Sequence, residues 1–174
     1  PGVTLQLLGA ANPNGGSIDL TGITTIDSRG TAGAGGNVTI AAYDGTGANS
    51  GRIIAGGTSI LTGGTGAASG NVTIIGADTN DASATAITTG SINTSGGTAG
   101  TGNITLAAAA LSQSATIVVN IPTGVTSGGT FIFGAANQKG ITVTGGLTSN
   151  GGTIRLDAGS TAGTGNIAVN GTIN

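Results

Sequence analysis

Gly36-Asn37-Val38-Thr39-Ile40 is the first strict copy of a five-residue pattern that recurs along the chain. In each copy the third and fifth residues are aliphatic, whereas the fourth is Thr, Ala or a charged residue. Successive side chains of a strand point to opposite faces. The pattern therefore predicts half-buried strands whose third and fifth residues face a core. The other strict copies are Gly70-Asn71-Val72-Thr73-Ile74, Gly102-Asn103-Ile104-Thr105-Leu106 and Gly165-Asn166-Ile167-Ala168-Val169, and looser copies are Gly16-Ser17-Ile18-Asp19-Leu20 and Gly152-Thr153-Ile154-Arg155-Leu156.

The segments between these copies also read as strands and tight corners. Runs of Gly, Ala and Thr precede three strict copies, at 30–35, 97–102 and 160–165. Dense glycine is typical of corners that need close backbone approach. No segment has the 3.6-residue period of a helix, so the sequence predicts an all-β protein. Further short β-branched strands are expected at 52–55, 59–62, 86–89, 91–94, 116–120, 130–133 and 141–144.

The spacing of the strict copies predicts a β-solenoid. Asn37, Asn71 and Asn103 recur at two nearly equal intervals, and three strands fit in each interval, as in a triangular coil. The looser copies lie much closer to a strict copy, which indicates irregular coil lengths. Each interval between two strict copies could also hold two short coils in place of one long coil. We therefore expect roughly five to nine coils, spaced about 4.8 Å apart. Residues 1–174 are predicted to be one solenoid domain, either a segment of a longer solenoid or a stacking fibre subunit.

Stacked coils would place equivalent side chains in columns. We predict one aliphatic column of Val38, Val72 and Ile104, and a second of Ile40, Ile74 and Leu106. We also predict a structural ladder of Asn37, Asn71, Asn103 and Asn166, whose side-chain amides bond along the stacking axis. Three of these asparagines begin Asn-x-Thr patterns, so glycan attachment is the alternative interpretation.

The composition excludes several kinds of site. The chain has no Cys and no His, which excludes zinc–thiolate sites, haem ligation and a Ser-His-Asp triad. Four basic residues and a net charge of −2 cannot form a nucleic-acid interface. No apolar run reaches the roughly 18 residues of a membrane span. No cofactor and no catalytic residue are predicted, and we do not expect an enzyme.

Asp78, Asn80 and Asp81 form the closest group of acidic and amide side chains. Their oxygens could bind calcium, since Ca²⁺ prefers oxygen ligands. A solvated loop is the simpler interpretation. Apart from this weak candidate, no metal site is predicted.

Two other features suggest binding. Outward-facing threonines could form rows of the kind that bind ice or carbohydrate, although unequal coil lengths argue against a regular array. The apolar segments 116–122 and 131–133, the latter with Phe131 and Phe133, are predicted to be core strands or a contact between protomers. Both terminal stretches also read as strands without a charged cap, so we expect end-to-end association or continuation of the same solenoid.

Residues 90–97 leading into Gly102-Asn103-Ile104-Thr105-Leu106, together with 151–156, resemble large bacterial surface proteins of the filamentous-haemagglutinin type. The resemblance implies a right-handed parallel β-helix, secretion to the cell exterior, and a role in adhesion, aggregation or surface fibres. It carries over no functional residue, because only scaffold positions match. The expected function is a non-catalytic structural or adhesive module of an extracellular fibre or large secreted adhesin, with host or matrix glycans as further partners. The alternatives are a carbohydrate- or ice-binding solenoid and, as a second alternative, a polysaccharide-acting β-helix enzyme.

Overall fold

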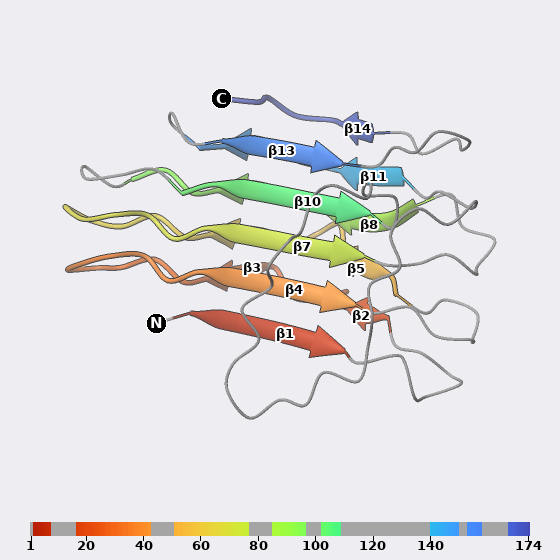
Figure 1. Cartoon of the computed structure of the whole chain (residues 1–174), viewed down its shortest axis with the longest axis horizontal. Coiled ribbons are helices and arrows are strands. Elements are labelled where there is room, and N and C mark those ends of the chain that lie inside the picture. The colour runs from red at the N-terminus through yellow and green to blue at the C-terminus, as the bar shows by residue number, and fades with distance from the viewer. Residues whose placement is uncertain are drawn as a thin grey trace.

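The computed structural model describes residues 2–7, 17–42, 51–76, 85–96, 102–108, 140–149, 153–157 and 167–174. Their regular elements are all strands, and these form three sheets (Figure 1). Sheet A contains β1 (Val3–Leu7), β4 (Val38–Ala42), β7 (Val72–Gly76), β10 (Ile104–Ala108) and β13 (Ile154–Asp157). Sheet B contains β2 (Ile18–Asp19), β5 (Ile53–Ala55), β8 (Thr85–Thr89), β11 (Gly140–Val143) and β14 (Ile167–Val169). Sheet C contains β3 (Thr25–Asp27), β6 (Ser59–Leu61), β9 (Ile92–Asn93) and β12 (Leu147–Thr148).

The chain passes through sheets A, B and C in turn and then returns to sheet A one strand further along. Every strand pair is parallel. Each of the first four coils therefore contributes one strand to each sheet, and the fifth contributes β13 to sheet A and β14 to sheet B, with only an isolated bridge at Ile173 beside sheet C. The prediction of an all-β protein with stacked parallel strands is confirmed, and the arrangement is compatible with a β-solenoid. The interval from Asn37 to Asn71 corresponds to one three-stranded coil and not to two short ones.

One coil is much longer than the others. One column of sheet A contains Val3, Val38, Val72, Ile104 and Ile154, and its last interval is about half as long again as any earlier one. The extra length lies between β10 and β11, which are joined by residues 109–139, whereas 77–84 join β7 to β8. The predicted strands at 116–120 and 130–133 fall in this connection, outside the described residues, as do Phe131 and Phe133.

The copies of the pentad do not all lie in the same sheet. Two copies lie in sheet B. The strict copy that contains Ile167 forms β14, and the looser copy that contains Ile18 forms β2. Their places in sheet A are taken by β13 and by β1, which was not predicted as a copy. The short sequence intervals between a looser copy and the nearest strict copy therefore count the residues from a strand of one sheet to a strand of another. They are not the lengths of complete coils. The pentad could not show this, because alternating burial is common to sheets A and B.

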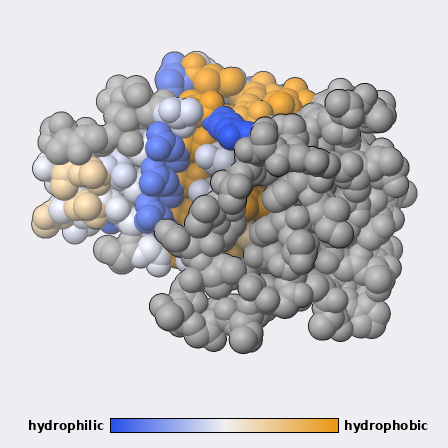
Figure 2. All heavy atoms as spheres, in the orientation of Figure 1, coloured by the Kyte–Doolittle hydropathy of each residue, from blue (hydrophilic) through white to orange (hydrophobic). Residues whose placement is uncertain are grey.

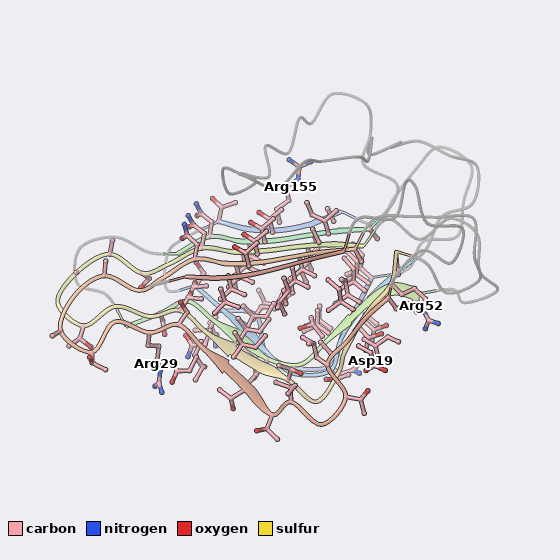
Figure 3. All side chains as sticks on the ribbon, turned by 90° about the horizontal axis from the view of Figure 1, so that it is seen from below. Asp19, Arg29, Arg52 and Arg155 are labelled. Carbon is pink, nitrogen blue, oxygen red and sulfur yellow. The ribbon has the colours of Figure 1, made fainter. Side chains whose placement is uncertain are left out.

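The inward faces of the three sheets enclose an aliphatic core (Figure 3). The predicted columns of Val38, Val72 and Ile104 and of Ile40, Ile74 and Leu106 are in register, and all six side chains are 0% exposed. β-Branched side chains suit such a pleated surface. Fully burying one aliphatic side chain stabilises the fold by about 1.5–3 kcal/mol. Sheet B adds a column made only of isoleucine: Ile18, Ile53, Ile87, Ile141 and Ile167.

Candidate functional site: the ladder, the lobes and the open ends

Asn37, Asn71 and Asn103 directly precede strands β4, β7 and β10 of sheet A, and they form a hydrogen-bonded ladder from coil to coil. Each side chain is exposed, and its Oδ1 accepts a hydrogen bond from the backbone N–H one coil further on. The donors are Asn71 at 2.8 Å, Asn103 at 2.8 Å and Thr153 at 2.9 Å. Thr153, which directly precedes β13, donates the last hydrogen bond of the ladder among the described residues. Asn166 lies outside the described residues, and the strand that follows it belongs to sheet B.

The ladder closes a gap in the backbone hydrogen bonding where sheet A begins. The Asn71 carbonyl accepts from Val38 N at 2.8 Å, while Asn71 N–H donates to the Asn37 side chain on the same neighbouring coil. Without the side chain, this N–H would find no acceptor on that coil. The asparagines therefore connect coils and have a structural role in this arrangement.

Asn71→Ala should lower the free energy of unfolding by about 0.5–1.5 kcal/mol, the usual net value of one hydrogen bond. The substitution removes the acceptor of Asn103 N–H. Urea denaturation followed by circular dichroism measures the change. Asn71→Asp retains a carboxylate acceptor and is the matched control. Equal destabilisation by both variants would contradict the role given to the Oδ1 atom.

The loops that lead from a strand of sheet C to the next strand of sheet A project from the sheets, and we call them lobes. They stack at one side of the molecule (Figure 1). A buried hydroxyl closes the base of each of two lobes. Thr62 Oγ1 donates to the Gly70 carbonyl at 2.6 Å, and Thr94 Oγ1 donates to the Gly102 carbonyl at 2.7 Å. Gly70 N–H donates back to the Thr62 carbonyl at 2.8 Å. The glycine-rich runs predicted corners here, but they did not predict these hydroxyls.

The missed signal is a hydroxyl residue eight positions before the glycine of a pentad. It is present at Thr62 and Thr94, and Ser28 stands in the same relation to Gly36. Ser28 is buried, and its carbonyl accepts from Gly36 N at 2.7 Å. The threonine hydroxyls satisfy backbone carbonyls that water cannot reach, so they also belong to the scaffold.

A pocket of about 220 Å³ lies beside these lobes, with Arg29, Thr65, Asn93 and Ser95 in its lining. The side chains of Arg29, Asn93 and Ser95 are bonded to neighbours on the protein. Arg29 Nη2 and Nε donate to the Asp27 carboxylate at 2.6 and 2.9 Å, and Asn93 Oδ1 accepts from Ser95 N at 2.8 Å and Oγ at 2.6 Å. These bonds order the wall of the pocket and place no nucleophile–base pair in it.

The Arg29 guanidinium, and then the Arg29 backbone N–H, lower the pKa of Asp27 from 3.8 to about 2. Since the folded-state pKa is depressed, this carboxylate stabilises the fold above about pH 4, and its contribution is lost as the pH falls toward about 2. Arg29→Ala should move the pKa of Asp27 back toward 3.8. An NMR titration of the Asp27 carboxyl carbon measures it, with Asp19 as an internal reference. An unchanged Asp27 titration in the variant would contradict the pairing.

Asp19 has a different partner: its Oδ1 accepts from Thr21 N at 2.8 Å, and bonding to Thr21 lowers the pKa of Asp19. Within the described ranges, no three His, Cys, Asp or Glu side chains gather as a metal site. Asp78, Asn80 and Asp81, the predicted calcium candidates, lie outside those ranges. The part of the chain that the structure describes contains no helix long and apolar enough to cross a membrane.

The outward threonines of sheet A form a single file. Thr4, Thr39, Thr73 and Thr105 are aligned in register, and Arg155 ends the column. The next column on the same side of the sheet contains Ala41, Ile75 and Ala107 in place of threonine, and these side chains are buried. The described face is therefore one row of hydroxyls and not a two-dimensional array.

The last layer of the stack ends in exposed aliphatic side chains. Ile167 of β14 is 45% exposed, and Ile173, which bridges to Leu147, is 54% exposed. The equivalent residues one coil earlier, Ile141 and Leu147, are 0% exposed. At the top edge of the view in Figure 2, where β13 and β14 lie in Figure 1, hydrophobic atoms are at the surface.

The first layer is less exposed than the last, since Ile18 of β2 is only 7% exposed, but its strand in sheet A is not fully covered. Val3 and Leu5 of β1 are only partly buried, and β1 is an edge strand of sheet A, as β13 is at the opposite edge. An edge strand presents unpaired N–H and C=O groups that can pair with another strand. The two ends of the stack are therefore the described surfaces best suited to bind a further strand layer.

Comparisons of the chain with protein-family models, with curated proteins and with solved structures found no match.

Proposed function

We propose that residues 1–174 form one non-catalytic structural module of an extracellular surface fibre or large secreted adhesin, built as a right-handed parallel β-helix. The observation that carries the proposal is the register of equivalent side chains through the layers of all three sheets, which shifts at one place, between Gly140 and Ile141 of β11. The asparagines of the ladder and the buried hydroxyls of Thr62 and Thr94, which recur from coil to coil, bond to the scaffold itself. Such a repeat can be extended by further layers, because a coil of a solenoid packs mainly against its two neighbours.

The charged residues support a structural role over a chemical one. Arg29 and Arg155 point away from the core (Figure 3). Arg29 pairs with Asp27, with both side chains largely in solvent. A glycoside-cleaving site would need two carboxyl groups about 5–10 Å apart across a bound sugar. In the described parts of the chain, the carboxylates of Asp19 and Asp27 each accept hydrogen bonds from a residue two positions further on, Thr21 and Arg29.

The proposed module continues, at its ends, either into further coils or into another copy. A two-copy chain tests this. Residue Asn174 of the first copy is joined to Pro1 of the second through a linker that repeats the sequence of residues 62–69, which supplies a lobe between sheet C and sheet A. Five further layers at about 4.8 Å each should lengthen the rod by roughly 24 Å in X-ray scattering. The tandem chain should unfold in one transition above that of the single copy.

The matched control is the same tandem chain with Val3→Asp in its second copy only, which places a carboxylate at the junction. This control should unfold as two separate units. If the unmodified tandem chain also unfolds as two units at the single-copy temperature, the proposal fails. Screening of the single copy against polysaccharides and a glycan array completes the test: hydrolysis would favour an enzyme, and glycan binding by a non-extending monomer would favour a binding module.

A further inference from the structure

We infer that the pocket beside the lobes is a binding subsite for one neutral sugar residue, which it holds by adjacent hydroxyl groups. The inference goes beyond the proposed function and does not depend on further coils or copies. Most of the lining belongs to the second coil, between β6 and the lobe that follows it, and the walls come from the first and third coils. The pocket therefore opens on the side of the stack and not at either end.

The pocket is a gap in an outward column that continues from the strands of sheet C. The register of β3, β6 and β9 aligns Arg29, Gly63 and Ser95 on successive coils, so a residue without a side chain lies between two that have one. A Cβ at Gly63 would lie closer than 3.0 Å to the Ser95 carbonyl oxygen, so close stacking keeps this position open. Leu61 supplies the apolar part of the lining.

The size of the pocket fits a small ligand. Its volume is about 220 Å³, below the roughly 300–1,000 Å³ of pockets that hold drug-sized molecules. One sugar ring with its hydroxyl groups is a ligand of this smaller class. The half-buried Leu61 can pack against the C–H groups of such a ring, while the polar walls face its hydroxyls.

The walls carry N–H donors on side chains that are already ordered. Both described hydrogen bonds of the Asn93 side chain are accepted by Oδ1, from Ser95 N at 2.8 Å and Ser95 Oγ at 2.6 Å, so the N–H groups of Nδ2 can donate to a ligand. Arg29 donates to Asp27 through Nε at 2.9 Å and Nη2 at 2.6 Å, which leaves Nη1 as a further donor. Ordering these groups before binding reduces the entropy that a ligand must remove.

The charge of the pocket favours a neutral ligand over an anion. Arg29 is the only charged residue in the lining, and its guanidinium is paired with the Asp27 carboxylate (Figure 3 shows Arg29 directed away from the core). The same pairing keeps the pKa of Asp27 at about 2, so the carboxylate is ionised at neutral pH. An anionic ligand would have to compete with Asp27 for the guanidinium, whereas sugar hydroxyls accept from the remaining N–H groups without displacing it.

An NMR titration of the isotope-labelled single copy tests the site, with the methyl glycosides of glucose, galactose, mannose and N-acetylglucosamine as probes. The Arg29 Nε–H and Ser95 backbone N–H signals report on binding. At least one glycoside should shift both signals, with a dissociation constant on the order of 1–10 mM, as expected for so small a ligand.

Asn93→Asp retains an acceptor for Ser95 but removes the N–H donors of the amide. It should weaken binding about two- to tenfold, the loss of one hydrogen bond. The matched control is Asn71→Asp, the same substitution in the ladder of sheet A, which should leave the affinity unchanged. Arg29→Met is a second variant at a side chain that is 56% exposed, so it should fold, and it should also weaken binding.

Shifts with acetate or glucuronate but with none of the neutral glycosides would identify an anion site and overturn the inference. The absence of shifts with all four glycosides would overturn it too, as would equal affinities of Asn93→Asp, Arg29→Met and Asn71→Asp. Failure of the pocket and failure of the proposed function are distinguishable, because the tandem chain tests the stacked module without any sugar and the titration tests the pocket on one copy.

Discussion

Val72→Asp should abolish cooperative folding of the chain. Val72 lies in the central layer of sheet A, 0% exposed, between Val38 and Ile104. An ionised carboxylate there would have only aliphatic neighbours in its column, and an unpaired buried charge costs several kcal/mol even after relaxation. The lost burial of valine adds about 1.5–3 kcal/mol. Together these approach the total stability of a typical domain, about 5–15 kcal/mol.

Far-ultraviolet circular dichroism during a thermal scan measures this effect. Thr73→Asp is the matched control, because Thr73 is the next residue of β7 and faces outward between Thr39 and Thr105. It should keep the β spectrum and a cooperative transition. Arg155→Gln, at an exposed position on the same sheet, should change folding little. A folded Val72→Asp chain whose melting temperature is unchanged would contradict the inward face assigned to this column.

Much of the fold was predictable because each of the three central coils begins with one strict copy of a strong local pattern, at β4, β7 and β10. The spacing of Asn37, Asn71 and Asn103 identified three successive strands of sheet A, and alternation identified their buried residues. Local alternation reports that a strand is half buried, but it does not report which sheet contains the strand. For that reason the strict copy at Ile167 resembles the sheet A copies in sequence, although β14 pairs with β11 in sheet B.

The polar scaffold was predictable only in part. The asparagine ladder followed from stacking, since identical side chains fall above one another once the coils are aligned. The buried hydroxyls of Thr62 and Thr94 could not be predicted from stacking. Their partners are carbonyls at the other end of the same lobe, so their burial depends on how the lobe closes. Alternation also places Ala41, Ile75 and Ala107 on the same side as the threonines, two residues further along each strand, but it did not predict that these three side chains are buried.

Gly70→Ala should destabilise the protein by about 3 kcal/mol, at the upper end of the usual cost of overpacking. A Cβ at position 70 would lie closer than 3.0 Å to the carbonyl oxygen of Gly36 on the neighbouring coil, and 2.5 Å from the Gly36 carbonyl carbon. Both atoms belong to the backbone, so no rotamer change can relieve the clash. The coils would have to separate at the base of a lobe, where Gly70 N–H donates to the Thr62 carbonyl and the Gly70 carbonyl accepts from the Thr62 hydroxyl.

Gly57→Ala is the matched control for Gly70→Ala. A Cβ at Gly57 would meet no atom within 4 Å. Removing a glycine at such a site reduces the entropy of the unfolded chain and commonly stabilises a protein by about 0.4–1 kcal/mol. Urea denaturation of the two variants should therefore give changes of opposite sign. Equal changes would mean that close approach between stacked coils does not explain the glycine at position 70, and that Gly36 and Gly70 do not need to be in contact for the layers to form.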